Sequence, residues 1–200
     1  MPQDPFDVID HLAGIGPTSS LQGLRLARQV ARDQAQDSFR ALFEPDGEGA
    51  VTAVERLAVA TFVAGLHQDA AATAFYAARL TGLHPSLASV VAAETVKAAA
   101  EGPFGRYPPG PLSEENVDGP VYVPGREASG ALGQRLSAAF SHGHLLLFHP
   151  RDAGPADLQA LFDAGWDNDG IVTLSQLIAF LSFQIRAAHG LRVLAGQSSR

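Results

Sequence analysis

Apolar residues recur every three or four positions along most of the chain, a spacing typical of helices with one buried face. Between residues 19 and 43 this stripe predicts one long amphipathic helix, with Ser19 or Ser20 as its N-cap. Its apolar positions are Leu21, Leu24, Ala27, Ala31, Ala35, Phe39 and Leu42. From Leu57 to Leu66 the chain is apolar on nearly every face, so we expect a buried central helix there.

Helix-start signals frame a helical hairpin in the first half of the chain. Thr52-Ala53-Val54-Glu55 has the pattern of a capping box, in which the Thr52 hydroxyl and the Glu55 carboxylate each bond to a free backbone N–H. Residues 65–69 predict a tight turn, after which Asp69 would cap a second helix that continues to Leu80. The two helices are therefore predicted to pack side by side as an αα-hairpin.

The rest of the chain also predicts helices, separated by proline, glycine and acidic residues. The expected helices cover residues 7–14, 85–101, 128–148, 155–164 and 167–194, and residues 196–200 are expected to form a frayed tail. Residues 102–126 are rich in proline and glycine and predict a long loop, which could be a lid, an arm toward a neighbouring subunit or a solvated linker. We therefore expect a single all-α domain over residues 1–200, with helical halves at 19–101 and 128–194 joined by a Pro/Gly-rich loop at 102–127.

Composition narrows the classes of function. Hydrophobic residues make up 46% of the chain, which is enough for a sizeable core. The formal net charge of −7 lacks the basic excess of a nucleic-acid-binding protein, so no nucleic-acid partner is expected. No unbroken apolar run reaches the ~18 residues of a membrane span, and residues 1–5 show no signal-peptide pattern. We therefore expect a cytoplasmic protein with no membrane partner.

Two segments resemble one known family. The first runs from Glu55-Arg56-Leu57-Ala58-Val59-Ala60 through an apolar helix and a turn at His67 to the helix Ala70 to Leu80. The second contains Leu158-Gln159-Ala160-Leu161, Ala164-Gly165-Trp166-Asp167, and then Ile171 through Phe180, Phe183 and Arg186. Both are similar to segments of the carboxymuconolactone decarboxylase and alkylhydroperoxidase D-like (AhpD-like) family. The resemblance covers roughly residues 19–101 and 130–194, and it implies an AhpD-like helical fold and a homo-oligomer, either a dimer or higher.

The family's thiol chemistry has no counterpart in this chain. Alkylhydroperoxidase-type members use a Glu, a Cys-x-x-Cys pair and a His; here the Glu matches Glu55, the cysteine positions fall on His67 and Ala70, and the His position falls on Ala74. The sequence contains no cysteine, so peroxide reduction by a thiolate and a resolving thiol is excluded. Decarboxylase-type members work by acid–base chemistry on a lactone, which stays open although the His position is vacant.

Glu55 and His67 are the leading candidates for acid–base chemistry on a small organic substrate. Imidazole transfers protons near neutral pH, and Tyr76 or Arg79 from the facing helix would be its partner. The simpler interpretation is that Glu55 only completes the capping box and that His67 only ends a helix, where the dipole favours it. In that case the fold serves as a non-catalytic binding or assembly module. We expect no cofactor.

Two segments of the sequence suggest a metal site. Residues 44–55 resemble a calcium-binding loop, with Glu44, Asp46, Glu48 and Glu55 as oxygen ligands, but Glu replaces the preferred Asp at two positions. The histidines His142, His144 and His149 lie close in sequence, but two residues spaced by two on a helix point to different faces. We therefore predict no metal site, and keep calcium binding as a third possible function.

Overall fold

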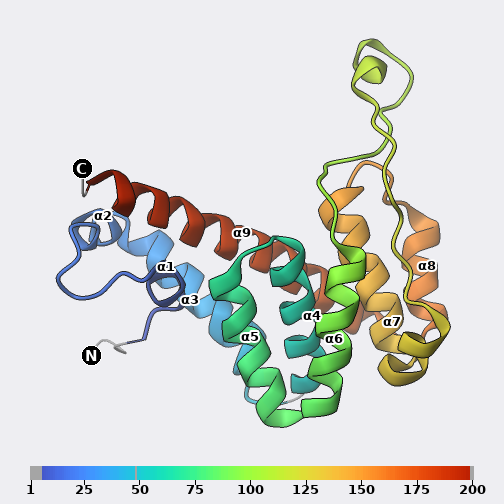
Figure 1. The fold of residues 1–200 in the computed structure, drawn as a ribbon, viewed down its shortest axis with the longest axis horizontal. Helices are drawn as coiled ribbons and strands as arrows, with labels where there is room; N and C mark the ends of the chain where they lie inside the picture. Colours follow the sequence, from blue (N-terminus) through green and yellow to red (C-terminus); the bar gives the residue numbers. More distant parts are fainter. Residues whose placement is uncertain (1–5, 48, 199–200) are drawn as a thin grey trace.

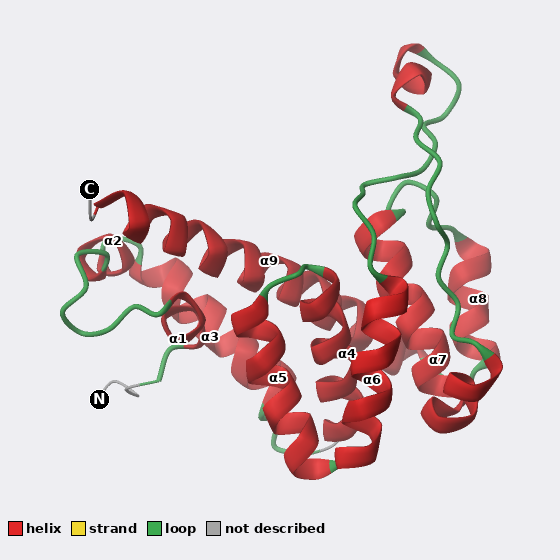
Figure 2. Cartoon of the chain, viewed as in Figure 1, coloured by secondary structure: helices red, strands yellow, loops and turns green. Residues whose placement is uncertain are grey.

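The computed structural model describes residues 6–47 and 49–198, and within these residues it is all-helical, as the sequence predicted (Figure 2). The expectations for residues 1–5, for Glu48 and for residues 199–200 lie outside the described part. The helices are α1 (Val8–Ala13), α2 (Gln22–Leu26), α3 (Gln29–Phe43), α4 (Ala53–Leu66), α5 (Ala70–Leu83), α6 (Pro85–Ala98), α7 (Arg126–Phe148), α8 (Pro155–Asp163) and α9 (Asn168–Ser198), with a short 3₁₀ helix at Pro111–Glu115.

Helix α4 is the centre of the molecule, as its continuous apolar sequence predicted. It packs against α5, α6, α7 and α9 (Figure 1). The ring of Phe62 on α4 stacks on that of Phe140 on α7 with 4.2 Å between centroids, and both residues are fully buried. Gly65 lets α6 approach closely, because a Cβ there would lie 2.2 Å from the Thr95 methyl carbon. Because α4 is held in place on several sides, the side chains at its two ends, Glu55 and His67, also have fixed positions.

The predicted hairpin forms, with each capping interaction in place. The Thr52 hydroxyl accepts a hydrogen bond from the Glu55 N–H, and the Glu55 carboxylate accepts one from the Thr52 N–H. After α4, Gln68 has a positive φ of 55° that turns the chain, and the Asp69 carboxylate caps α5 through the Ala72 N–H. Asp69 also pairs with Arg192, which ties this turn to α9.

The long helix predicted for residues 19–43 is wrong in two respects. Its N-cap is Leu21, which makes no side-chain capping bond, instead of Ser19 or Ser20, and the helix is divided into α2 and α3. Arg28 leaves the helical region, with φ −122° and ψ 43°. Arg25 and Arg32 converge on Asp10 of α1 and on Asp7, the N-cap of α1: Arg25 Nε lies 2.6 Å from Asp10 and Arg32 Nε lies 3.0 Å from Asp7. These partly buried ion pairs hold the first three helices together.

Helix α9 is the longest helix and crosses much of the molecule. It packs against α1, α3, α4 and α7, so the end of the chain lies on its beginning (Figure 1). It extends to Ser198, beyond the predicted end at residue 194, and residues 196–198 are helical instead of frayed. Its segment 168–196 is long and apolar enough to span a membrane, although 44% of its most apolar window is buried inside the molecule. The sequence contains no unbroken apolar run of about 18 residues. A helix of this length and composition also occurs in the cores of proteins that do not span a membrane.

Residues 99–125 form an arm that stands out from the helical body, as Figures 1 and 2 show. Gly105 and Val117 pair as an isolated antiparallel bridge, and Arg106 bonds to Asp118 across the two strands of the arm. At the root of the arm, the buried Tyr122 hydroxyl donates a hydrogen bond to Glu94 over 2.8 Å.

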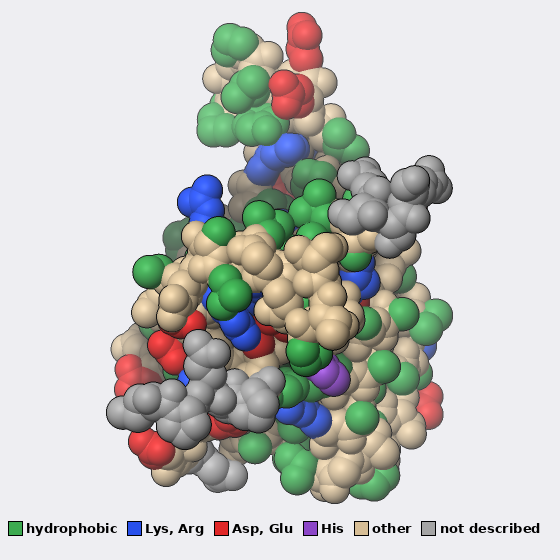
Figure 3. All heavy atoms as spheres, turned by 90° about the vertical axis from the view of Figure 1, so that its left-hand side faces the viewer, with side chains coloured by type: hydrophobic (Ala, Val, Ile, Leu, Met, Phe, Trp, Pro, Cys, Tyr) green, Lys and Arg blue, Asp and Glu red, His purple; other side chains and the backbone are tan. Residues whose placement is uncertain are grey.

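The tip of the arm rises above the helical body in Figure 3, and hydrophobic and acidic side chains gather on it. The tip residues include the exposed Leu112, Glu114 and Glu115. The predicted loop is thus an ordered arm.

Candidate small-molecule site

An open cavity of about 770 Å³ lies where the end of α4, the first residues of the arm, the end of α7 and the middle of α9 meet. Most of its wall is apolar, and its polar groups come from three different elements. The lining consists of Leu66, His67, Gln68, Ala100, Glu101, Gly102, Pro103, Leu146, Leu147, Phe148, Pro150, Ile178, Ala179, Ser182 and Arg186. Mostly apolar walls with a few placed polar groups are typical of small-molecule sites.

His67 is placed in this cavity by the end of α4, where it is the C-cap residue. Its Nε2 lies 3.2 Å from Oγ of Ser182 on α9. The Ser182 hydroxyl donates its proton to the Ile178 carbonyl over 3.0 Å, so the imidazole N–H is the donor in the contact between His67 and Ser182. Ser182 is therefore not arranged as a nucleophile activated by His67.

The electrostatics of the cavity keep His67 neutral. Burial, followed by the positive charge of Arg186, lowers the pKa of His67 to about 4, and Asp69 offsets this only in part. Arg186 lies one helical turn beyond Ser182 on α9 and is exposed. Within the described chain it forms no hydrogen bond or ion pair. The site thus offers a neutral imidazole and an unpaired guanidinium side by side.

Glu55 does not reach this cavity, which corrects the predicted proton relay. It begins the helix that His67 ends, twelve residues or roughly 18 Å along the helix axis. Its carboxylate bonds to Thr52 and accepts a hydrogen bond of 2.7 Å from Nε of Arg135. Burial acts to raise the pKa of Glu55, but the hydrogen bonds from Arg135 and Thr52 outweigh it and hold the pKa below its usual value.

Tyr76 and Arg79 are also away from His67. Tyr76 is fully buried, and its hydroxyl donates to Oε1 of Gln184 over 2.5 Å. Burial raises the pKa of Tyr76 far above its ordinary value. The Arg79 guanidinium lies over the Phe75 ring, 4.1 Å from its centre. Of the four predicted site residues, the structure therefore brings only His67 to the cavity.

Sequence reasoning missed Ser182 as a site residue and used Arg186 only as a family marker. Both lie on one face of α9, at the i, i+4 spacing that places two side chains together. That spacing was visible in the sequence. What was not visible is that this face meets the end of α4, because the contact joins residues that are 115 positions apart.

Among the described residues, which exclude Glu48, neither of the two metal arrangements suggested by the sequence gathers its ligands. In the described residues, no three histidine or acidic side chains are grouped so as to hold an ion. Nε2 of His142 lies 3.4 Å from the Ser175 hydroxyl, whereas His149 contacts Asp152 and the Pro120 carbonyl. In the calcium-like segment 44–55, the Glu55 carboxylate is already engaged by Thr52 and Arg135.

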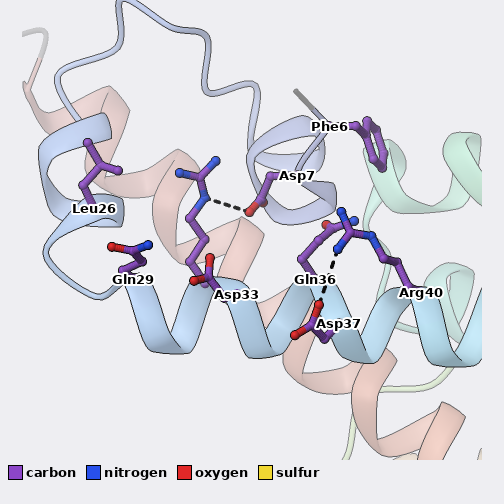
Figure 4. Close-up of a pocket in the computed structure, with 9 residues that line it drawn as sticks. Phe6, Asp7, Leu26, Gln29, Asp33, Gln36, Asp37 and Arg40 are labelled. Atoms are coloured by element: carbon purple, nitrogen blue, oxygen red, sulfur yellow. Dashed lines mark hydrogen bonds and ion pairs between the residues drawn. The ribbon is translucent and has the colours of Figure 1, made fainter. Parts of the chain in front are cut away.

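A second hollow of about 320 Å³ lies between the residue preceding α1 and α3. Figure 4 shows Arg40 directed at Asp37, and the hollow also holds the ion pair between Arg32 and Asp7. Because these four charged side chains are paired with one another, the hollow offers a ligand less than the cavity beside His67 does.

Comparison with known protein families and with curated proteins finds no match to this chain, so the AhpD-like resemblance rests on the residues quoted for it.

Proposed function

We propose that this chain is a divergent, cysteine-free AhpD-like protein that binds a small organic molecule in the cavity beside His67. The observation that carries the proposal is the cavity's position at the turn between α4 and α5, where the resembling family has its cysteine pair and this chain has His67 and Ala70. The cavity volume lies within the range of ligand sites in other proteins.

Binding is favoured over acid–base catalysis by the positions of the candidate groups. A general base needs a partner that holds it and a proton within reach. Glu55 is engaged at the far end of α4, and the Ser182 hydroxyl is directed at a backbone carbonyl. The proposed role of the fold is therefore that of a binding module, without thiol chemistry and without a catalytic carboxylate.

The test is a screen of small organic molecules by thermal shift, followed by calorimetry of each hit with two variants of the protein. Ala179→Trp places a bulky ring on an exposed wall residue, whereas Ala78→Trp adds the same ring to an exposed position of α5 outside the cavity. Hits should lose affinity in Ala179→Trp and keep it in Ala78→Trp. A screen without hits, or hits that ignore Ala179→Trp, would overturn the proposal.

Assembly with further copies of the same chain is part of the proposal. Several large apolar side chains of α9 are exposed, namely Val172, Phe183, Val193 and Leu194, and such positions are often covered in oligomers. Light scattering coupled to size exclusion would give the subunit number. A monomer across the micromolar range would remove this part of the proposal and leave ligand binding untouched.

A further inference from the structure

We infer that the ligand of this cavity is a monocarboxylate with an apolar body, held at its anionic end by Arg186. The inference deepens the proposed function and rests on it. Three features of the cavity carry it: an uncommitted guanidinium, walls that are largely hydrocarbon, and a single acidic residue in the lining.

The first feature is that Arg186 differs from the arginines that hold the fold together. Arg56 donates to the Leu42 carbonyl, Arg135 to Glu55 and Arg192 to Asp69, so each is committed within the protein. Arg186 lines the cavity and has no hydrogen-bonding partner among the described residues. A guanidinium presents paired N–H donors that match the two oxygens of a carboxylate.

The second feature is the apolar wall beyond Arg186. Leu66, Leu146, Leu147, Phe148 and Ile178 come from α4, α7 and α9 and give the cavity its hydrocarbon surface. Burying a ring or a short alkyl chain against them contributes roughly 25 cal/mol per Å² of apolar surface. An inorganic anion has no apolar part that could cover this wall, which would stay exposed to water. An organic acid, which has such a part, is therefore favoured.

The third feature is Glu101, which lines the same cavity and forms no ion pair with Arg186. Its carboxylate would repel a second anionic group on the ligand. A ligand with one carboxylate satisfies Arg186 and leaves Glu101 in solvent, whereas a dicarboxylate brings like charges together. This selects monocarboxylates.

His67 adds a pH dependence to the same site. The charged groups acting on it are Arg186 on α9 and Asp69 in the α4–α5 turn, and Glu101 lines the same cavity. A bound carboxylate cancels the repulsion from Arg186 and favours the imidazolium, so binding takes up a proton. Affinity should therefore stay constant near neutral pH and increase only at acidic pH, as the pH falls toward the His67 pKa of about 4.

The experiment is calorimetric titration of the full chain with benzoate, with the neutral isostere benzamide and with the dicarboxylate terephthalate. Benzoate should bind about tenfold or more tightly than either of the others. Arg186→Gln should remove this preference, and Arg186→Lys should restore part of it. Arg106→Gln, an exposed arginine on the arm, is the matched control and should leave all three affinities unchanged.

The outcomes separate the two proposals. Benzamide bound as tightly as benzoate, or an unchanged preference in Arg186→Gln, would overturn the carboxylate inference while leaving the binding site intact. Terephthalate bound as tightly as benzoate would overturn the role given to Glu101. Absence of binding by these probes and by every compound of the general screen would overturn both proposals. The comparison of benzoate with benzamide uses the unmodified protein, so it does not depend on the folding of any variant.

Discussion

The Glu55 carboxylate accepts a hydrogen bond of 2.7 Å from Arg135, a residue 80 positions later in the chain. Arg135 also donates to the carbonyls of Ala50 and Gly165, and its guanidinium lies 4.1 Å from the centre of the Trp166 ring. The Trp166 indole returns a hydrogen bond to the Arg135 carbonyl. One arginine thus joins the start of α4, the middle of α7 and the turn between α8 and α9.

This arrangement predicts that Glu55→Gln weakens the fold and leaves the ligand site unchanged. The substitution removes the charge partner of Arg135 and weakens the cap of α4. We expect a loss of about 1–3 kcal/mol in the free energy of unfolding, measured by urea denaturation. Glu115→Gln on the exposed arm is the matched control and should cost nothing measurable.

The opposite pattern would return Glu55 to the functional site. If Glu55→Gln kept its full stability but lost affinity for the cavity ligand, the assignment of Glu55 to a structural role would be wrong. Both quantities can be measured on the same preparation.

The arm depends on the contact between Tyr122 and Glu94. Glu94 is almost fully buried; burial acts to raise its pKa, whereas hydrogen bonds from Lys97 and Tyr122 lower it. Tyr122→Phe removes one of these two donors, so we expect a loss of about 1–2 kcal/mol and faster amide exchange over residues 104–117. Hydrogen exchange followed by mass spectrometry would measure this.

Tyr107→Phe provides the control, because it removes a hydroxyl from the same arm that makes no hydrogen bond with the described residues. Its exchange pattern should match the unmodified chain. If Tyr122→Phe also left the exchange of the arm unchanged, the root contact would not be what holds the arm in place.

Local signals predicted the helices well, because caps and turns act over a few residues. The capping box at Thr52 and the cap at Asp69 form as the sequence indicated. The division between α2 and α3 was not predictable in this way, since it depends on ion pairs between Arg25 or Arg32 and the distant acidic residues Asp7 and Asp10. The same limit applies to the site, where His67 was found but its neighbours on α9 were not.

Acid should destabilise the protein through its buried histidines. Burial, followed by the charge of His149, lowers the pKa of His144 to about 4, although a hydrogen bond to the Ala98 carbonyl opposes this. In the unfolded chain the pKa of His144 is near 6.5. Between this pH and pH 4, the unfolded state therefore binds a proton at His144 that the folded state does not bind. The free energy of unfolding is therefore independent of His144 above pH 7 and falls as the pH decreases from 6.5 toward 4, by roughly 3 kcal/mol for this residue.

Urea denaturation between pH 7 and pH 5 measures this slope. His144→Gln should have a shallower slope than the unmodified chain, whereas His189→Gln, which changes an exposed histidine of α9, should run parallel to it. Equal slopes for the unmodified chain and His144→Gln would show that folding does not lower the pKa of this imidazole.

Tyr76 and Gln184 should behave as one structural unit. Both are fully buried, the tyrosine hydroxyl donates to Gln184 Oε1, and the Gln184 amide nitrogen has no partner among the described residues. Tyr76→Phe or Gln184→Leu alone leaves a buried polar atom unpaired, which costs about 1–3 kcal/mol. The double variant removes both polar groups together, so its cost should be clearly smaller than the sum of the two single costs. The buried pair described here predicts that the losses in free energy of unfolding are not additive and that Tyr76→Phe keeps its affinity for the cavity ligand. If Tyr76 were catalytic, these losses would be additive and Tyr76→Phe would lose function.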